Sequence, residues 1–191
     1  MISDIQENLF SYESIISGRS EINVQNLYKL LVDNKKIPYD SNSYCESDTR
    51  SEDSHCPKTQ IVESLSKDME LAYFKVIGEK ISCTECWGHI HEKNMSTRLH
   101  NHYSTYVSGV FYVSTPKGSG SIVFPRSKKL DWKLGSELKN VTYEPKEGMF
   151  LLFPGHLNHY VTRNKSENLR VSISFNFCLE RTLNFNKFTY F

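Results

Sequence analysis

Two short stretches of the sequence carry side chains that could hold a metal ion. His100 and His102 lie two residues apart, just before the apolar run of residues 107–113, and His159 comes much later in the chain. On an extended segment, residues two apart point to the same side, so His100 and His102 can bind one ion together. With His159 as a third ligand, the ion keeps open positions for oxygen and for a bidentate molecule. This pattern is typical of mononuclear non-haem iron sites.

A group that could bind an acid follows the third histidine. Arg170 comes 11 residues after His159, which allows a turn and a return along a neighbouring strand. A guanidinium holds a carboxylate through two parallel hydrogen bonds, a geometry that lysine cannot copy. Ser172 shares the face of Arg170 and could add a hydroxyl donor. Tyr112 is expected to point into the same cavity, because it shares a strand face with Val110.

Residues 170–177 alternate strictly between polar and apolar side chains. The apolar positions are Val171, Ile173, Phe175 and Phe177, and the polar ones are Arg170, Ser172, Ser174 and Asn176. Such a strand either has one face in solvent or lines a pocket with its polar face. The two histidine clusters favour the pocket, because binding sites combine an apolar body with a few convergent polar groups.

Other histidines leave alternatives open. His89 and His91 form a second pair with the same spacing and could make a rival metal site. His156 lies in a Pro-Gly turn and is expected at the rim, and His55 lies in a polar stretch where exposure to solvent is expected. Taken alone, each of these is more often a structural or surface histidine than a ligand.

The five cysteines are expected to be free thiols, because their number is odd and no secretory signal is visible. Cys83 and Cys86 have metal-ligand spacing, and Cys45 with Cys56 could complete a zinc site. However, residues three apart on a regular strand point to opposite faces, which argues against this site.

Bulk properties exclude several classes of function. The chain has 191 residues, enough for one domain, and its net charge of +1 gives no reason to expect nucleic acid or an anionic membrane as a partner. No window approaches the roughly 18 apolar residues of a membrane helix, and the first residues are acidic rather than basic. We therefore expect a soluble cytoplasmic protein.

The pattern of elements divides the chain near residue 80. Residues 1–80 are expected to be mainly helical, with helices at 24–32 and 60–76 and a mobile loop at 41–58. From 81 to 180, short apolar runs alternate with turn signals, which predicts a sandwich or barrel.

Seven blocks of residues resemble one enzyme family in order and spacing. They are Trp87, His100-Asn101-His102, residues 108–113, residues 116–126 with Pro116, Gly118, Gly120 and Phe124-Pro125-Arg126, residues 148–154, His159 with Val161 and Asn164, and residues 170–176. Over residues 80–178 the chain resembles the 2-oxoglutarate- and Fe(II)-dependent oxygenases. It is most similar to a small subgroup from bacteria and marine phages that is related to the prolyl-4-hydroxylase type.

This resemblance implies a double-stranded β-helix (jelly-roll, cupin-like) core with flanking helices. It also implies an enzyme that hydroxylates an amino-acid, peptide or small-metabolite substrate with molecular oxygen. It implies Fe(II) on His100, His102 and His159. It further implies 2-oxoglutarate on Arg170, with Tyr112 helping to bind the distal carboxylate. Arg126 and the loop 127–135 either border the substrate entrance or form a basic surface turn.

One departure keeps two other functions open. The usual family motif is His-x-Asp or His-x-Glu, and here the second residue is His102. A neutral imidazole cancels none of the metal charge. A three-histidine dioxygenase of cupin type without 2-oxoglutarate, or a non-catalytic metal-binding jelly roll, would fit the same ligands.

Overall fold

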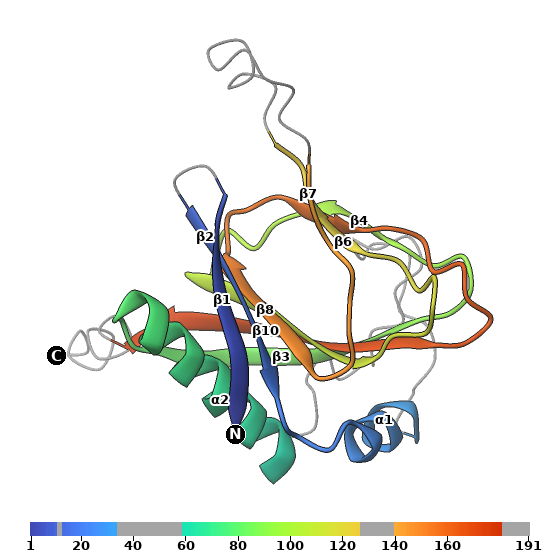
Figure 1. Cartoon of the computed structure of the whole chain (residues 1–191), viewed down its shortest axis with the longest axis horizontal. Coiled ribbons are helices and arrows are strands. Elements are labelled where there is room, and N and C mark those ends of the chain that lie inside the picture. Colours follow the sequence, from blue (N-terminus) through green and yellow to red (C-terminus); the bar gives the residue numbers. More distant parts are fainter. Residues whose placement is uncertain (11–12, 34–58, 127–139, 181–191) are drawn as a thin grey trace, which may run out of the picture.

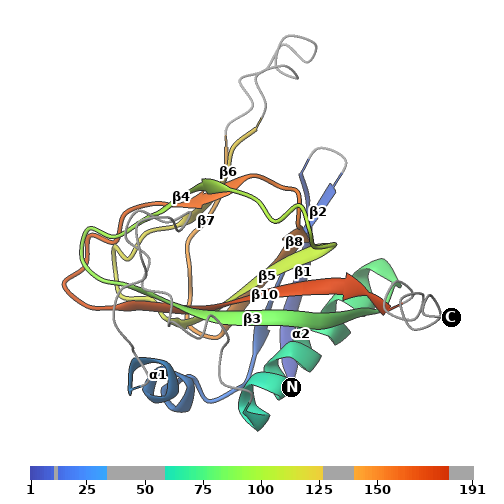
Figure 2. The same cartoon turned by 180° about the vertical axis from the view of Figure 1, so that it is seen from behind.

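Two antiparallel β-sheets face each other and form the body of the molecule (Figures 1 and 2). The computed structural model describes residues 1–10, 13–33, 59–126 and 140–180. Within these residues the larger sheet has six strands, β1 (Ile2–Phe10), β2 (Glu13–Ser20), β8 (Met149–Pro154), β5 (Val107–Ser114), β10 (Arg170–Leu179) and β3 (Ile81–His91), in this spatial order. The smaller sheet has four, β4 (Thr97–His100), β9 (His159–Val161), β6 (Ile122–Phe124) and β7 (Val141–Tyr143).

The connections make this a double-stranded β-helix, which confirms the predicted fold class. From β3 to β10 each successive strand lies in the opposite sheet, except that β6 and β7 are neighbours in the smaller one. All of these pairings are antiparallel. The strands β1 and β2 extend the larger sheet beyond β8.

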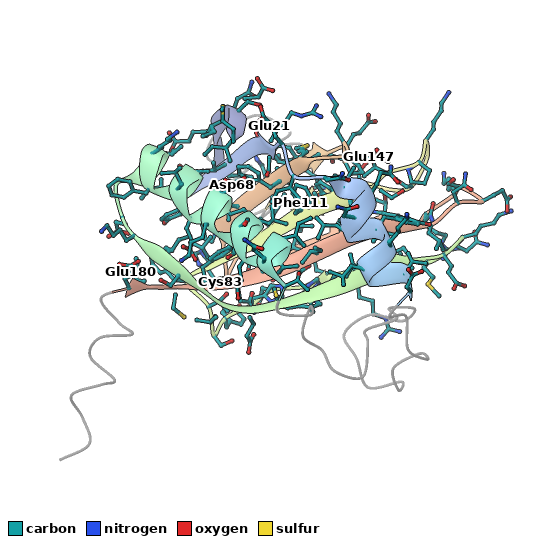
Figure 3. The ribbon with its side chains drawn as sticks, turned by 90° about the horizontal axis from the view of Figure 1, so that it is seen from below. Glu21, Asp68, Cys83, Phe111, Glu147 and Glu180 are labelled. Atoms are coloured by element: carbon teal, nitrogen blue, oxygen red, sulfur yellow. The ribbon has the colours of Figure 1, made fainter. Side chains whose placement is uncertain are left out.

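Two helices cover the outer face of the larger sheet (Figures 1 and 3). They are α1 (Val24–Asp33) and α2 (Gln60–Ile77), close to the two predicted ranges. Buried Leu31 of α1 packs so closely on β3 that a Cβ at Gly88 would lie 2.8 Å from its Cδ2 atom. The helix α2 ends at Gly78, whose φ of 81° is the left-handed conformation that glycine adopts without strain.

Residues 2–10 and 13–20 correct the expectation that residues 1–80 are mainly helical. They form β1 and β2, and β2 pairs with β8, so that Ile16 lies opposite Leu152. In β2, Ile15 belongs to the core between the sheets and Ile16 to the core under the helices, and both are buried. Because both faces of this strand are covered, its sequence lacks the alternation that marks a half-exposed strand. The predicted loop 41–58 lies outside the described residues.

The strand β10 has two buried faces with different surroundings. Its apolar side chains, Val171, Ile173, Phe175 and Phe177, belong to the core under the helices. Its polar side faces the space between the two sheets, where Arg170, Ser172 and Ser174 line a pocket. The polar face therefore lines a pocket rather than facing solvent, as the histidine clusters had suggested.

Asn164 joins the two turns that close one end of the barrel. It is completely buried, and its Nδ2 donates to the carbonyl oxygens of His91 (2.9 Å) and Asn168 (3.0 Å). Its Oδ1 accepts from the backbone N–H of Ser166 at 2.9 Å, and its own N–H donates to the Met95 carbonyl at 2.8 Å. One side chain thus ties the end of β3 to the segment that leads into β10.

We predict that Asn164→Ala lowers the free energy of unfolding by about 2–4 kcal/mol, because three hydrogen bonds of a buried side chain are lost. Urea denaturation measures this change. The exposed Asn168 provides the matched control, and Asn168→Ala should change stability by less than about 0.5 kcal/mol. Equal stability of the two variants would contradict the proposed tie.

Candidate active site

Three histidines meet between the sheets, two from neighbouring strands and His102 from the segment that follows β4. His100 ends β4 and His159 begins β9, and the two residues lie directly opposite each other in the register of this strand pair. Their ring centroids are 4.3 Å apart, and those of His102 and His159 are 5.4 Å apart. One ring nitrogen from each of His100, His102 and His159 lies within 4.8 Å of the other two. In the described part of the chain, this is the group of three that could hold a metal ion.

Backbone carbonyls orient two of the three rings. The Nδ1 of His100 lies 2.8 Å from the Arg98 carbonyl oxygen, and the Nδ1 of His159 lies 2.9 Å from that of Leu157. A carbonyl only accepts hydrogen bonds, so each Nδ1 carries the proton. The lone pair is then on Nε2, which is the arrangement that second-shell hydrogen bonds impose on metal-binding histidines.

The backbone holds the third histidine in place. The N–H of His102 donates to the Gly155 carbonyl at 2.7 Å, and the His102 carbonyl accepts from the backbone and hydroxyl of Thr105, both at 3.0 Å. A Cβ at Gly155 would lie 2.4 Å from the Thr105 carbonyl oxygen, so only glycine permits this approach. The turn before His159 is therefore locked to the segment that carries His102.

Burial keeps His159 neutral. Desolvation, together with Coulomb repulsion from the nearby His100 and His102, lowers the pKa of this side chain to about 3. The hydrogen bond to Leu157 opposes this shift. At neutral pH the ring is thus unprotonated, and its lone pair is available to an ion.

Arg170 lies in the same pocket, and its guanidinium is held on several sides. It is only 2% exposed, and its Nη1 donates to His91 Nδ1 at 3.1 Å and to Ser172 Oγ at 3.3 Å. Its Cζ lies 5.4 Å from the centre of the Tyr112 ring. Burial raises the pKa of Tyr112 to about 12, although the charge of Arg170 acts in the opposite direction, so the phenol is neutral.

The predicted site residues come together in one pocket between the sheets. It is lined by His100, His102, His159, Arg170 and Ser172. Tyr112 does not line it but is buried next to Arg170. His156 is exposed, as expected for the rim, whereas His55 and loop 127–135 lie outside the described residues.

The second histidine pair forms a wall of this pocket. Trp87 Nε1 donates to His89 Nε2 at 2.6 Å, and the Trp87 ring lies 5.7 Å from that of His102. His91 uses one ring nitrogen toward Arg170 and the other toward Thr97. The rival metal site is therefore not formed in the described residues. The sequence signal for this wall was the alternation of aromatic rings at 87, 89 and 91, which share one strand face.

The cysteine pair corrects one geometric expectation. A register irregularity opposite residues 83–85 lets Cys83 and Cys86 both pack against the core under the helices, rather than on opposite faces of β3. Burial raises the pKa of the Cys83 thiol to about 12, so this group stays protonated and binds metal poorly. Cys45 and Cys56 lie outside the described residues.

Residues 85–176 match a family model described as "Putative 2OG-Fe(II) oxygenase". The match confirms the resemblance to the 2OG-Fe(II) oxygenases that the sequence predicts. It runs from β3 to β10 and contains the three histidines and Arg170. The family description names Fe(II) and 2-oxoglutarate, which argues against the alternative dioxygenase that does not use 2-oxoglutarate. A search of curated proteins finds no match to this chain.

Solved oxygenase structures share the fold. HygX from Streptomyces hygroscopicus, with nickel, 2-oxoglutarate and hygromycin B bound, is similar with a TM-score of 0.64 and 14% identity over 87% of this chain and 83% of that one. A Pseudomonas putida prolyl-4-hydroxylase has a TM-score of 0.61 and 14% identity over 89% and 95%. A viral collagen prolyl hydroxylase from Paramecium Bursaria Chlorella virus-1, in complex with 2-oxoglutarate, has a TM-score of 0.59. It is 14% identical over 83% of this chain and 90% of that one.

The described part of the chain includes no helix that is long and apolar enough to cross a membrane.

We predict that the metal-free protein loses stability in mild acid because of His159. Between pH 6.5 and about 3 the unfolded chain binds a proton at this ring and the folded chain does not. The free energy of unfolding therefore falls as the pH is lowered through this window, by about 1.5 kcal/mol between pH 6.5 and 5. Urea denaturation with a chelator present, at both pH values, measures the effect.

The variant His159→Gln should lack this part of the pH dependence, because it has no titrating ring. The exposed His156 provides the control, and His156→Gln should follow the wild type. If His159→Gln loses as much stability as the wild type over this range, the ring is protonated in the folded protein and the assignment is wrong.

Proposed function

We propose that His100, His102 and His159 bind Fe(II), and that Arg170 holds 2-oxoglutarate beside the metal so that an organic substrate is hydroxylated. The observation that carries this proposal is the set of three histidine nitrogens within 4.8 Å, in a pocket that Arg170 also lines. A metal-binding jelly roll without activity would need the histidines but would have no use for a buried guanidinium next to them.

The donor set fits a divalent iron ion. Imidazole is a good ligand for Fe(II), and His100 and His159 each direct a lone pair from Nε2. In place of the usual carboxylate, His102 leaves both positive charges of the ion uncancelled. A dianionic cosubstrate is therefore attracted at least as strongly as in a site with an acidic ligand.

The surroundings of Arg170 fit the far end of a dicarboxylate. Ser174 of β10 pairs with Trp87, whose ring lies next to that of His102. Arg170 begins the same strand, four residues before Ser174. This separation is roughly 13 Å along the strand. A long guanidinium side chain and a five-carbon diacid together can span it. Ser172 places its hydroxyl, and Tyr112 its ring, next to the guanidinium at this end.

The side chains of this chain bind, orient and exclude water. When bound, iron and 2-oxoglutarate supply the activation of oxygen, with loss of carbon dioxide from the oxo acid and formation of succinate. Phe153 and Phe124 pack against His159, with ring centroids 4.8 Å and 5.9 Å away, and form an apolar wall on that side. Such a wall limits the access of water to the metal.

Hydroxylation is the reaction that we propose, because two of the similar structures are prolyl hydroxylases. Candidate substrates are peptides or small molecules. HygX, which has hygromycin B bound, provides the small-molecule precedent.

We predict that the protein binds Fe(II) anaerobically, and that 2-oxoglutarate then produces the weak visible charge-transfer band of a chelated 2-oxo acid. Arg170→Gln should raise the dissociation constant for 2-oxoglutarate by about 10- to 100-fold, because a charge-assisted interaction is lost. The control is Arg163→Gln, which removes an exposed guanidinium and should leave the constant unchanged. A metal-loaded wild type without the band would refute the proposal.

We further predict that His159→Ala loses Fe(II) binding, since the most buried of the three ligands is removed. Competition with a chromophoric chelator measures the affinity. His156→Ala removes an exposed histidine three residues away and should bind Fe(II) as the wild type does. Equal affinities for the two variants would show that the ion binds elsewhere.

A further inference from the structure

His91 contacts Arg170 but is neither a proposed metal ligand nor on the same strand. It ends β3, where it lies opposite Arg170 in the register with β10, and it is only 2% exposed. Its Nδ1 lies 3.1 Å from Arg170 Nη1, and its Nε2 lies 2.9 Å from Thr97 Oγ1. Both ring nitrogens therefore have polar partners.

These two contacts determine the state of the His91 ring. A guanidinium only donates hydrogen bonds, so Nδ1 must accept the bond from Arg170. A neutral histidine that accepts at Nδ1 carries its proton on Nε2, and Nε2–H then donates to the Thr97 hydroxyl. The guanidinium, which only donates, therefore selects this tautomer, and the Thr97 hydroxyl holds the ring in place by accepting from Nε2–H. The other neutral tautomer would place an N–H against the guanidinium.

A neutral acceptor does something for Arg170 that an acid could not. An aspartate or glutamate at position 91 would also accept a hydrogen bond, but it would cancel the charge of the guanidinium and compete with an incoming carboxylate. A neutral imidazole fixes the direction of Nη1 and leaves the positive charge in place. Ser172, the second acceptor on Nη1, is also uncharged.

The same contacts fix which side of the guanidinium meets the ligand. Nη1 donates to both His91 and Ser172, and the Tyr112 ring lies close to Cζ. A carboxylate that forms two parallel hydrogen bonds therefore has to approach the Nε and Nη2 side. This orientation depends on His91, because the Ser172 contact, at 3.3 Å, is the longer of the two bonds at Nη1.

We propose that His91 is a positioning residue that, held in place by its hydrogen bond to Thr97, aims Arg170 at the distal carboxylate of the cosubstrate. The inference rests on the proposed role of Arg170 and adds two residues to it. It also links the sheets, because Thr97 lies on β4, the strand that carries His100, and Arg170 lies on β10. The site for the acid is thereby tied to the strand that carries the first histidine.

The test compares 2-oxoglutarate with 2-oxopentanoate, which has the same chain length but lacks the distal carboxylate. Dissociation constants of both are measured anaerobically on the Fe(II)-loaded protein. We expect His91→Leu to raise the dissociation constant for 2-oxoglutarate about 10-fold or more, since a hydrogen bond to a charged group is lost. Binding of 2-oxopentanoate should stay within about twofold, because a factor of two is a small free-energy change. General damage to the pocket would raise both dissociation constants and leave their ratio unchanged, so the ratio reports on the distal carboxylate alone.

Conservative variants test the hydrogen bonds themselves. His91→Asn keeps an acceptor near the position of Nδ1 and should recover most of the discrimination. Thr97→Val is nearly isosteric and removes the acceptor for His91 Nε2–H, so the ring is no longer held and discrimination should be lost, whereas Thr97→Ser should keep it. The threonine pair also decides the question if His91→Leu does not fold. The control is His156→Leu, which changes an exposed histidine and should behave as the wild type.

The outcomes separate this inference from the proposed function. If the wild type prefers 2-oxoglutarate but His91→Leu and Thr97→Val keep the same ratio, the role of His91 is wrong and that of Arg170 stands. If the variants bind both oxo acids more weakly by the same factor, His91 is structural only, and the inference is also wrong. If the wild type itself shows no preference for 2-oxoglutarate, Arg170 does not bind the distal carboxylate, and both proposals fail.

Discussion

The site depends on the register of β4 against β9, which sets His100 opposite His159. Directly opposed residues are the closest side-chain neighbours in an antiparallel pair, and a shift by one residue would turn one ring to the other face. Both strands are short, with four and three residues, so the ladder alone holds this register weakly. Contacts outside the ladder supply the rest: Gly155 accepts from His102 at one end, and Asn164 ties the turns at the other.

The helices contribute to this site although they do not touch it. The inner face of β10 carries polar groups into a closed interior, which costs free energy unless each group is hydrogen-bonded. Arg170 is bonded to His91 and Ser172, and Asn176 accepts from Ser108 and donates to Glu85. The outer face of the same strand is apolar and is buried under α1 and α2. Burial on this side offsets the cost of the polar row and fixes the strand that carries Arg170.

The sequence predicts well what depends on short-range periodicity. The two helices follow from a 3.6-residue pattern, the polar and apolar faces of β10 follow from a two-residue pattern, and the proximity of His100 and His102 follows from their spacing. What it does not predict depends on distant partners. The strand β2 takes its conformation from pairing with β8, Cys83 and Cys86 share a face through a local irregularity of β3, and His91 finds its role only where β3 meets β10. In each case the neighbour that decides the outcome is far away in the sequence.

The charges of the pocket explain why a histidine at position 102 is compatible with an oxygenase. With three neutral ligands, as we propose, the ion keeps its full charge, and the buried guanidinium of Arg170 adds another positive charge in the same pocket. A dianion then places one negative charge at each end. The ion increases the affinity for the diacid, and by thermodynamic reciprocity the diacid increases the affinity for the ion by the same factor. An acidic residue at position 102 would weaken this coupling by supplying part of the charge itself. The neutral set therefore makes retention of the metal depend on the cosubstrate, and it makes the neutrality of His91 beside Arg170 part of the same electrostatic arrangement.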